Sequence, residues 1–462
     1  MLLAGTPARC ILSSDSPGVT LRKMNKQRRW LFRELDRWTS GAIVTPEQAA
    51  RIRALYPSEE PGAPWGLIAF SGIGAVVVGL GVILLLAYNW EDIPRLGKLA
   101  LILGATAATH TGGTILRERP GWPGQFAEVF SVLGTMFFGA GIWLVAQIYH
   151  IDEHYPNGYL FWGLGALAMA WALRSVPQGL IAVATLSIWG GSEVVGFARG
   201  AEFVFVMLAA GILPLAWHKR SIVLLGAVLA GLYLMLIMHA GHRGGASTGF
   251  LAAISLSVLL VGASKCVPSR GDLAPLGGTL RFFGTAAFVI CLYILTFENA
   301  ADDLLARRSP ADEIPWQAAS YRWTPGIAAL AIWVWIARDL LGGRREAARL
   351  DEWLMPVILL FSHAFAAAGA RHFDLLAVAV FNLAAFLLAA LWMVQGCREG
   401  RLGRTVVGSL LLAAVVLARF FDLFESLAVR GLIFVVLGAV LLAEGFYYRK
   451  LRRASAGEEA PS

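Results

Sequence analysis

The chain has 462 residues, of which 57% are hydrophobic and only 15% are charged, and its formal net charge is +8. Soluble proteins carry about 25% charged residues, so this composition excludes a water-soluble globular protein. Apolar runs near the length of about 20 residues that a helix needs to cross a bilayer recur from Trp65 to the C-terminus. We therefore expect an all-α, polytopic membrane protein with the lipid bilayer as its partner.

The first 60 residues are polar and basic, unlike the rest of the chain. In this segment Thr45, Pro46 and Gln48 have the pattern of a helix start with a capping box, and Gly41 suits the end of a preceding helix. The opening residues lack the basic region, apolar core and cleavage site of a signal peptide. This pattern predicts a short amphipathic helical hairpin on the cytoplasmic side of the membrane.

The predicted domain organisation follows from these shifts in composition. It has four parts: a disordered tail over 1–23, the helical hairpin over 24–60, a transmembrane bundle over 65–448, and a basic-to-polar cytoplasmic tail over 449–462.

The apolar runs predict about 14 membrane spans, with a range of about 12–14 because several runs have only about 15 residues. The spans are Trp65–Tyr88, Leu96–Ile115, Phe126–Ile148, Tyr159–Leu173, Gly179–Phe197, Phe203–Trp217, Ile222–His239, Gly249–Ala263, Phe282–Phe297, Gly326–Leu340, Leu354–Ala368, Leu375–Val394, Val406–Phe421 and Gly431–Tyr448.

The distribution of Lys and Arg predicts the orientation of these spans. With the N-terminus in the cytoplasm, 29 of the 39 basic residues lie in or beside cytoplasmic segments. Cytoplasmic loops of membrane proteins carry such an excess of Lys and Arg. We therefore expect both termini in the cytoplasm. The loops containing "NWED" and "HIDEHYP" then face outward.

The sequence has no signal for a cofactor or metal. Its cysteines, Cys10, Cys266, Cys291 and Cys397, are far apart and form no CxxC pair, so we expect free thiols. Phosphate-loop, dinucleotide and nucleophile-elbow motifs are missing, and basic residues do not cluster with aromatics as nucleic-acid binding would require. We expect no cofactor and no nucleic-acid partner, and no catalytic residue is assigned.

Three stretches together resemble a known family of bacterial membrane proteins. They are "WTSGAIVTPEQAARIRALYP" (Trp38 to Pro57), "LLLAYNWEDIPRLGKLAL" (Leu84 to Leu101) and "FGAGIWLVAQIYHI" (Phe138 to Ile151). In order and spacing they resemble the family called "domain of unknown function 2157" over about residues 30–193, and the stretch 418–442 resembles its closing helix pair. The resemblance implies a multi-pass inner-membrane protein and assigns no catalytic residues.

The loop "AQIYHIDEHYP" (Ala146 to Pro156) has the most concentrated polar chemistry in the chain. His150 and His154 are four residues apart, but the zinc signature H-E-x-x-H needs Glu directly after the first His, and Ile151 stands there. A solvated loop, a metal or substrate site and a pH-sensitive element are the three interpretations. The family-like motifs meet at the outer face, so our candidate polar cleft consists of Asn89, Trp90, Gln147, Tyr149 and His150.

Polar side chains within spans are further candidates, because burying them in lipid is costly. Glu193, His363 and Asn382 are such intramembrane groups. His363 and Asn382 are expected near the middle of adjacent spans, either as hydrogen-bonding contacts between helices or as a proton or substrate pathway. Arg419 and Asp422 are three residues apart and predict a structural ion pair, with an anion or substrate site as the alternative.

These features predict a transporter-like bundle with a polar cleft at the extracytoplasmic face. A non-catalytic scaffold or sensor subunit is the first alternative. The second is an intramembrane enzyme that uses His150 and outer-loop carboxylates. Assembly with a second copy or with other membrane subunits is compatible with each interpretation.

Overall fold

The computed structural model describes residues 20–55, 92–120, 124–151, 154–297, 316–342, 350–368 and 374–423, together with positions 435, 438 and 439. All secondary-structure elements in these ranges are helical, which confirms the predicted fold class. The chain divides into two compact units, residues 1–97 and 98–462, and each is described by itself.

Two described helices lie within the first unit, α1 (Thr20–Ser40) and α2 (Pro46–Ala54). In the predicted capping box, the Thr45 hydroxyl accepts a hydrogen bond from the Gln48 backbone N–H, and the Gln48 side chain accepts one from the Thr45 N–H. Leu35 of α1 and Ala49 of α2 are buried, while Arg53 pairs with Asp36. The predicted start of the second helix is therefore confirmed.

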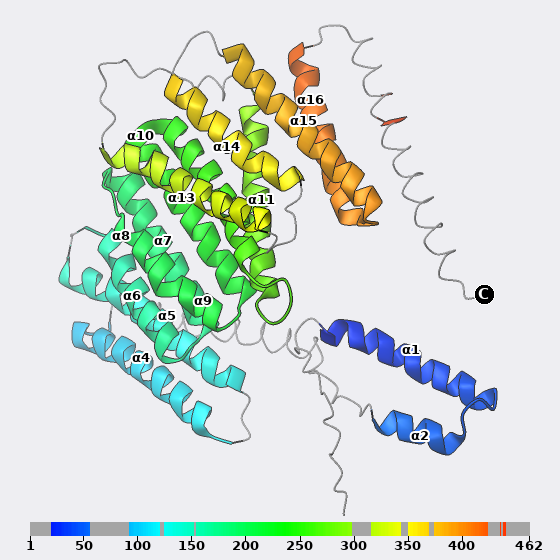
Figure 1. Cartoon of the computed structure of the whole chain (residues 1–462). Coiled ribbons are helices and arrows are strands. Elements are labelled where there is room, and N and C mark those ends of the chain that lie inside the picture. The colour runs from blue at the N-terminus through cyan, green and yellow to red at the C-terminus, as the bar shows by residue number, and fades with distance from the viewer. Residues whose placement is uncertain are drawn as a thin grey trace, which may run out of the picture. The chain divides into compact units, whose positions relative to one another are not determined.

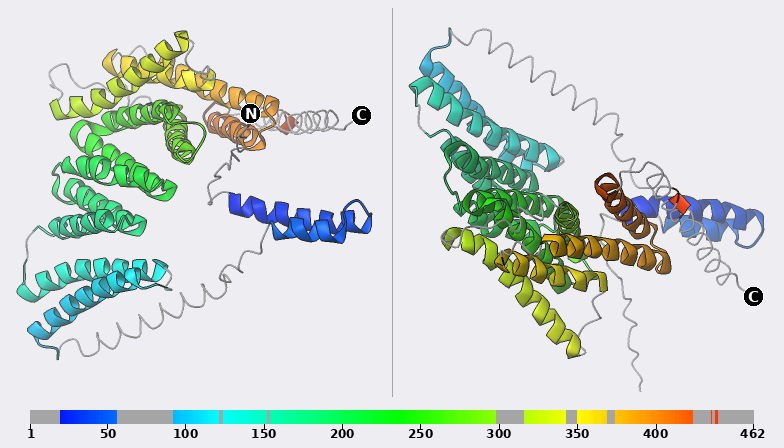
Figure 2. Two further views of the ribbon diagram at one scale, coloured as in Figure 1. Left: turned by 60° about the horizontal axis from the view of Figure 1, so that its bottom comes forward. Right: turned by 90° about the horizontal axis from the view of Figure 1, so that it is seen from above.

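The second unit contains the remaining described helices (Figure 1). They are α4 (Arg95–Glu118), α5 (Gly124–Tyr149), α6 (Pro156–Ala172), α7 (Val176–Phe197), α8 (Phe203–Val206), the π-helix η1 (Met207–Ile212), α9 (Leu213–His218), α10 (Ile222–Cys266), α11 (Ala274–Leu295), α13 (Trp316–Leu341), α14 (Leu350–Ala368), α15 (Asp374–Arg398) and α16 (Leu402–Leu423). Helices α6 and α7 pack side by side, as do α15 and α16 (Figure 1, Figure 2).

Within the described ranges, eight helices are long and apolar enough to cross a membrane. The shorter apolar stretches Phe203–His218 and Leu402–Ala418 also coincide with predicted spans. The chain is thus a polytopic membrane protein by the length and composition of its helices. The predicted first span, Trp65–Tyr88, and last span, Gly431–Tyr448, lie outside the described residues, and the total of about 14 spans stays a prediction.

The predicted start of α13 is wrong. We expected this span to begin at Gly326, after Pro325, but the helix begins at Trp316 and continues through the proline. Proline lacks the N–H that completes the helical ladder, yet membrane helices tolerate it when neighbouring groups satisfy the freed carbonyl. The early part of α13, where Ala318 and Arg322 are buried, therefore belongs to the bundle.

Helix α10 consists of two antiparallel halves, which correspond to the predicted spans Ile222–His239 and Gly249–Ala263. Gly245 divides them, since its backbone is non-helical at φ 77° and ψ 179°. The Tyr233 and Ser257 hydroxyls lie 3.0 Å apart across the pair. Near the turn, a Cβ on Gly249 would lie 3.8 Å from the Gly241 Cα, so small residues allow the two backbones to approach closely.

Replacing Gly245 with valine should destabilise this hairpin, because its backbone conformation is open essentially only to glycine. We expect a loss of about 1–3 kcal/mol. The measurement is the apparent melting temperature of the purified protein in detergent. Gly278→Val in α11 is the matched control, because a Cβ there has no atom within 4 Å. Equal melting temperatures for the two variants would contradict the assigned turn.

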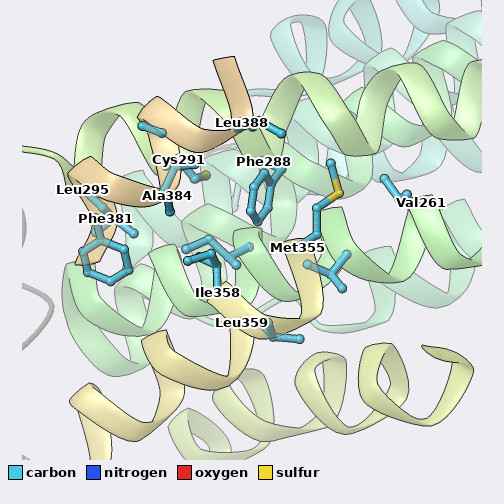
Figure 3. Close-up of a cluster of buried hydrophobic side chains, with 14 of the residues drawn as sticks. Val261, Phe288, Cys291, Leu295, Met355, Ile358, Leu359, Phe381, Ala384 and Leu388 are labelled. Atoms are coloured by element: carbon cyan, nitrogen blue, oxygen red, sulfur yellow. The ribbon is translucent and has the colours of Figure 1, made fainter. Parts of the chain in front are cut away.

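The largest apolar core among the described residues joins α10, α11, α13, α14, α15 and α16. Figure 3 shows Phe288 of α11 among Met355, Ile358 and Leu359 of α14. Phe381 and other residues of α15 close the cluster from another side. Packing of this kind stabilises membrane helices through van der Waals contacts, since lipid itself is apolar.

A buried charge network lies at the N-terminus of α14. Glu352 accepts a hydrogen bond from the Lys265 Nζ at 2.6 Å and pairs with Arg281. The neighbouring Asp351 accepts bonds from the Trp392 indole at 2.9 Å and from Arg404 at 3.2 Å. Carboxylates are favoured at this end of a helix, where the backbone N–H groups supply partial positive charge. The network links α14 to α10, α11, α15 and α16.

Candidate functional site

A cavity of about 450 Å³ lies between α4, α5 and α6 in the second unit. Its walls are largely aliphatic and aromatic, and four lining residues, Thr106, His154, Tyr155 and Asn157, bring polar side chains to it. The remaining lining residues are Ile102, Leu103, Phe137, Phe138, Gly141, Ile142, Trp143, Val145, Ala146, Ile151, Gly158 and Phe161. An apolar pocket with a few polar groups is the usual form of a small-molecule site.

The end of α5 determines which part of "AQIYHIDEHYP" reaches this cavity. His150 has a positive φ of 53°, its N–H bonds to the Gln147 carbonyl, and the Ile151 N–H bonds to the Ala146 carbonyl. These two bonds form a Schellman motif, with His150 in the left-handed position that glycine usually fills. His150 thus terminates α5 through its backbone, and its side chain is exposed.

His154 lies in the short connection after α5 and contacts a carboxylate of α7. Its Nε2 is 2.6 Å from the Glu193 Oε1, and that oxygen also accepts the Trp189 indole N–H at 3.2 Å. Glu193 is only 6% exposed. The Phe197 ring packs edge-on against the imidazole, with centroids 4.1 Å apart. Trp189, Glu193 and Phe197 are four residues apart, so they share one face of α7.

This arrangement gives His154 a defined chemical role. A carboxylate bound to one imidazole nitrogen orients the ring and leaves the other nitrogen for a ligand. Among the described residues, Nδ1 of His154 makes no hydrogen bond. It can therefore accept a proton or a hydrogen bond from a molecule in the cavity.

The sequence was compared with known families, and one match covers the segment that contains the cavity lining. Residues 36–179 match the family model described as Predicted membrane protein (DUF2157). The predicted resemblance is confirmed over these residues. No curated protein and no solved structure matches the chain. All residues that line the cavity fall inside the DUF2157 match, whereas Glu193 and the stretch 418–442 lie beyond its end.

The predicted polar cleft was placed in this DUF2157 segment, but its described members lie elsewhere. Gln147, Tyr149 and His150 are all exposed, Tyr149 by 55%, and none of the three lines the cavity. Asn89 and Trp90 lie outside the described residues. The structure therefore associates the cavity with His154 and not with His150.

The predicted intramembrane groups His363 and Asn382 do not line the cavity. His363 has its Nδ1 3.0 Å from the Leu359 carbonyl and its Nε2 3.2 Å from the Arg322 carbonyl. The Asn382 amide donates to the carbonyls of Thr296, at 3.1 Å, and of Val378, at 2.7 Å. Both side chains thus bind backbone, and no hydrogen bond joins them in the described part of the chain. These contacts suit packing between helices.

The predicted pair of Arg419 and Asp422 is in α16, but these side chains lie outside the described residues. Among the predicted site residues whose side chains are described, Glu193 is the one whose side chain bonds to a residue lining the cavity. Sequence analysis missed its pairing with His154, because the two are 39 residues apart and no spacing rule connects them.

A second polar cluster joins the α7–α8 connection to α10. Glu202 accepts a hydrogen bond from Arg243 at 2.8 Å, and the His239 Nε2 accepts the Ala201 N–H at 3.2 Å. Burial raises the pKa of Glu202, but hydrogen bonds from its own backbone N–H and from Arg243 lower this pKa by more, so it lies below its ordinary value. None of these residues lines the cavity.

Proposed function

We propose that the chain is a transporter-like protein of the bacterial inner membrane that binds a small amphipathic molecule in the α4–α6 cavity. The observation that carries this proposal is the cavity itself, since an apolar pocket ending at an oriented histidine can hold a molecule with an apolar body and a polar end. A purely structural scaffold does not require such a space.

The proposal includes an orientation with both termini in the cytoplasm. The positive-inside distribution of Lys and Arg supports it. In this orientation the end of α5, the start of α6 and the end of α7 lie at the extracytoplasmic face. The ligand then enters from outside, while exposed apolar side chains away from the cavity, such as Leu101 and Leu164, contact lipid or another membrane subunit.

Cysteine labelling tests both parts of the proposal. In a variant without native cysteines, Thr106→Cys places a thiol in the cavity, about halfway along α4. The matched control is Ala107→Cys, at nearly the same depth, because Ala107 is exposed but does not line the cavity. A charged, membrane-impermeant methanethiosulfonate is added to intact spheroplasts. Thiolates react and thiols in lipid do not, so we expect Thr106→Cys to react about tenfold faster or more.

Each alternative gives a different labelling result. Equal, negligible labelling at both positions would contradict a water-accessible cavity and favour the scaffold. Labelling of Thr106→Cys only in inverted vesicles would overturn the proposed orientation and leave the cavity in place.

A further inference from the structure

The charge around the cavity restricts the ligands that it can hold. Among the described residues, the lining contains no Lys, Arg, Asp or Glu. The charged group bonded to the lining is the Glu193 carboxylate, which lies behind His154 and is itself almost fully buried. With a neutral imidazole and an ionised carboxylate, the pair has a net charge of −1 and brings no positive charge to the lining.

An anionic ligand therefore has no positive charge to compensate the loss of its hydration. Moving an ion out of water is costly unless an opposite charge meets it. A cationic ligand, in contrast, has the Glu193 carboxylate as a counter-ion through the imidazole ring. The electrostatics of the pair favour a cation over an anion of the same size.

The N-terminus of α6 does not change this preference. Helix N-termini bind anions through their free backbone N–H groups. Here Pro156 has no N–H, the Asn157 N–H bonds to the His154 carbonyl at 3.1 Å, and the Gly158 N–H bonds to the Tyr155 carbonyl at 3.1 Å. The donors that would hold an anion are thus already satisfied by the preceding connection.

Aromatic rings around the cavity provide a second source of affinity for cations. Trp143 and Tyr155 line it together with three phenylalanines. The face of an aromatic ring carries partial negative charge, and a cation within about 6 Å of its centre is attracted to it. Rings also pack against an apolar body, so the same walls fit both parts of one molecule.

We propose that the cavity binds a lipophilic cation, an apolar molecule with an ammonium or phosphonium centre, and that Glu193 is its counter-ion behind His154. This inference rests on the proposed function, because it requires a cavity that a ligand can enter. It adds to the proposed function that the ligand is a cation and that Glu193 selects it.

Two ions of nearly equal shape test the charge preference directly. Tetraphenylphosphonium and tetraphenylborate are measured by equilibrium dialysis against the full-length protein in nanodiscs. Partition into lipid is subtracted with Gly141→Leu, which fills the cavity from a position where a Cβ has room, 3.4 Å from Ile102. We expect cavity-dependent binding of the cation and not of the anion. Equal or tighter binding of tetraphenylborate to the wild-type protein would overturn the proposal without any further variant.

The second test removes the counter-ion. Glu193→Gln should weaken tetraphenylphosphonium binding about tenfold, the effect of one charge several ångströms away at intermediate permittivity. Glu202→Gln removes a carboxylate that pairs with Arg243, away from the lining, and should change binding less than about twofold. Unchanged affinity in folded Glu193→Gln protein would overturn the inference. The proposed function fails separately, if Thr106→Cys is closed to the labelling reagent.

Discussion

Replacing Glu352 with alanine should lower the free energy of unfolding by about 3 kcal/mol, the lower end of the range for breaking a buried ion pair. Glu352 is 2% exposed and joins Lys265 of α10 to Arg281 of α11. Its removal takes from both cations the carboxylate that they share at the N-terminus of α14. We choose the lower end because the side chains of Lys265 and Arg281 are 24% and 40% exposed, so water partly compensates them.

The measurement is the apparent melting temperature of the detergent-solubilised protein. Loss of the monodisperse peak on a size-exclusion column reports the unfolding. Asp272→Ala is the control, because this carboxylate pairs with Arg220 on an exposed surface. Exposed pairs contribute about 0–1 kcal/mol, so the control should change little. A melting temperature for Glu352→Ala as high as that of the control would contradict a buried network.

Hydropathy predicts the spans because burial of the backbone in lipid requires helices of a minimum length. It predicts their ends less well. Helix α7 starts at Val176, before the predicted Gly179, because the Ser175 hydroxyl caps the Gln178 N–H at 3.3 Å. Helix α13 passes through Pro325, which sequence alone presents as a boundary. Local capping and packing, not apolar content, determine where these helices begin.

The candidate site was less predictable than the fold. Sequence analysis selected "AQIYHIDEHYP" and Glu193 separately, and it preferred His150 to His154. The structure exposes His150, because this residue takes the left-handed position that ends α5. His154 lines the cavity and contacts Glu193, which comes from another helix. Only the packing of α6 against α7 brings this histidine and carboxylate together.

Sequence analysis also does not predict which face of a membrane helix packs against other helices. Trp333 and Trp335 stand two residues apart in the apolar run "AIWVWIA" of α13, and hydropathy does not distinguish them. In the structure Trp333 is 2% exposed and Trp335 is 44% exposed. The Trp333 indole donates a hydrogen bond to the Val258 carbonyl of α10 at 3.0 Å and packs edge-on against Trp353, with centroids 5.1 Å apart.

Trp333→Ala should therefore lose about 3–5 kcal/mol, since it leaves a large cavity and removes a buried hydrogen bond. Trp335→Ala, on the exposed face, should lose less than about 1 kcal/mol. Melting temperatures of the two variants in detergent give the comparison. Because the substitutions remove the same atoms from the same helix, composition and helix propensity cancel between them. A similar loss in both would mean that α13 turns a different face to α10, and the core around Phe288 and Met355 would have to be reassigned.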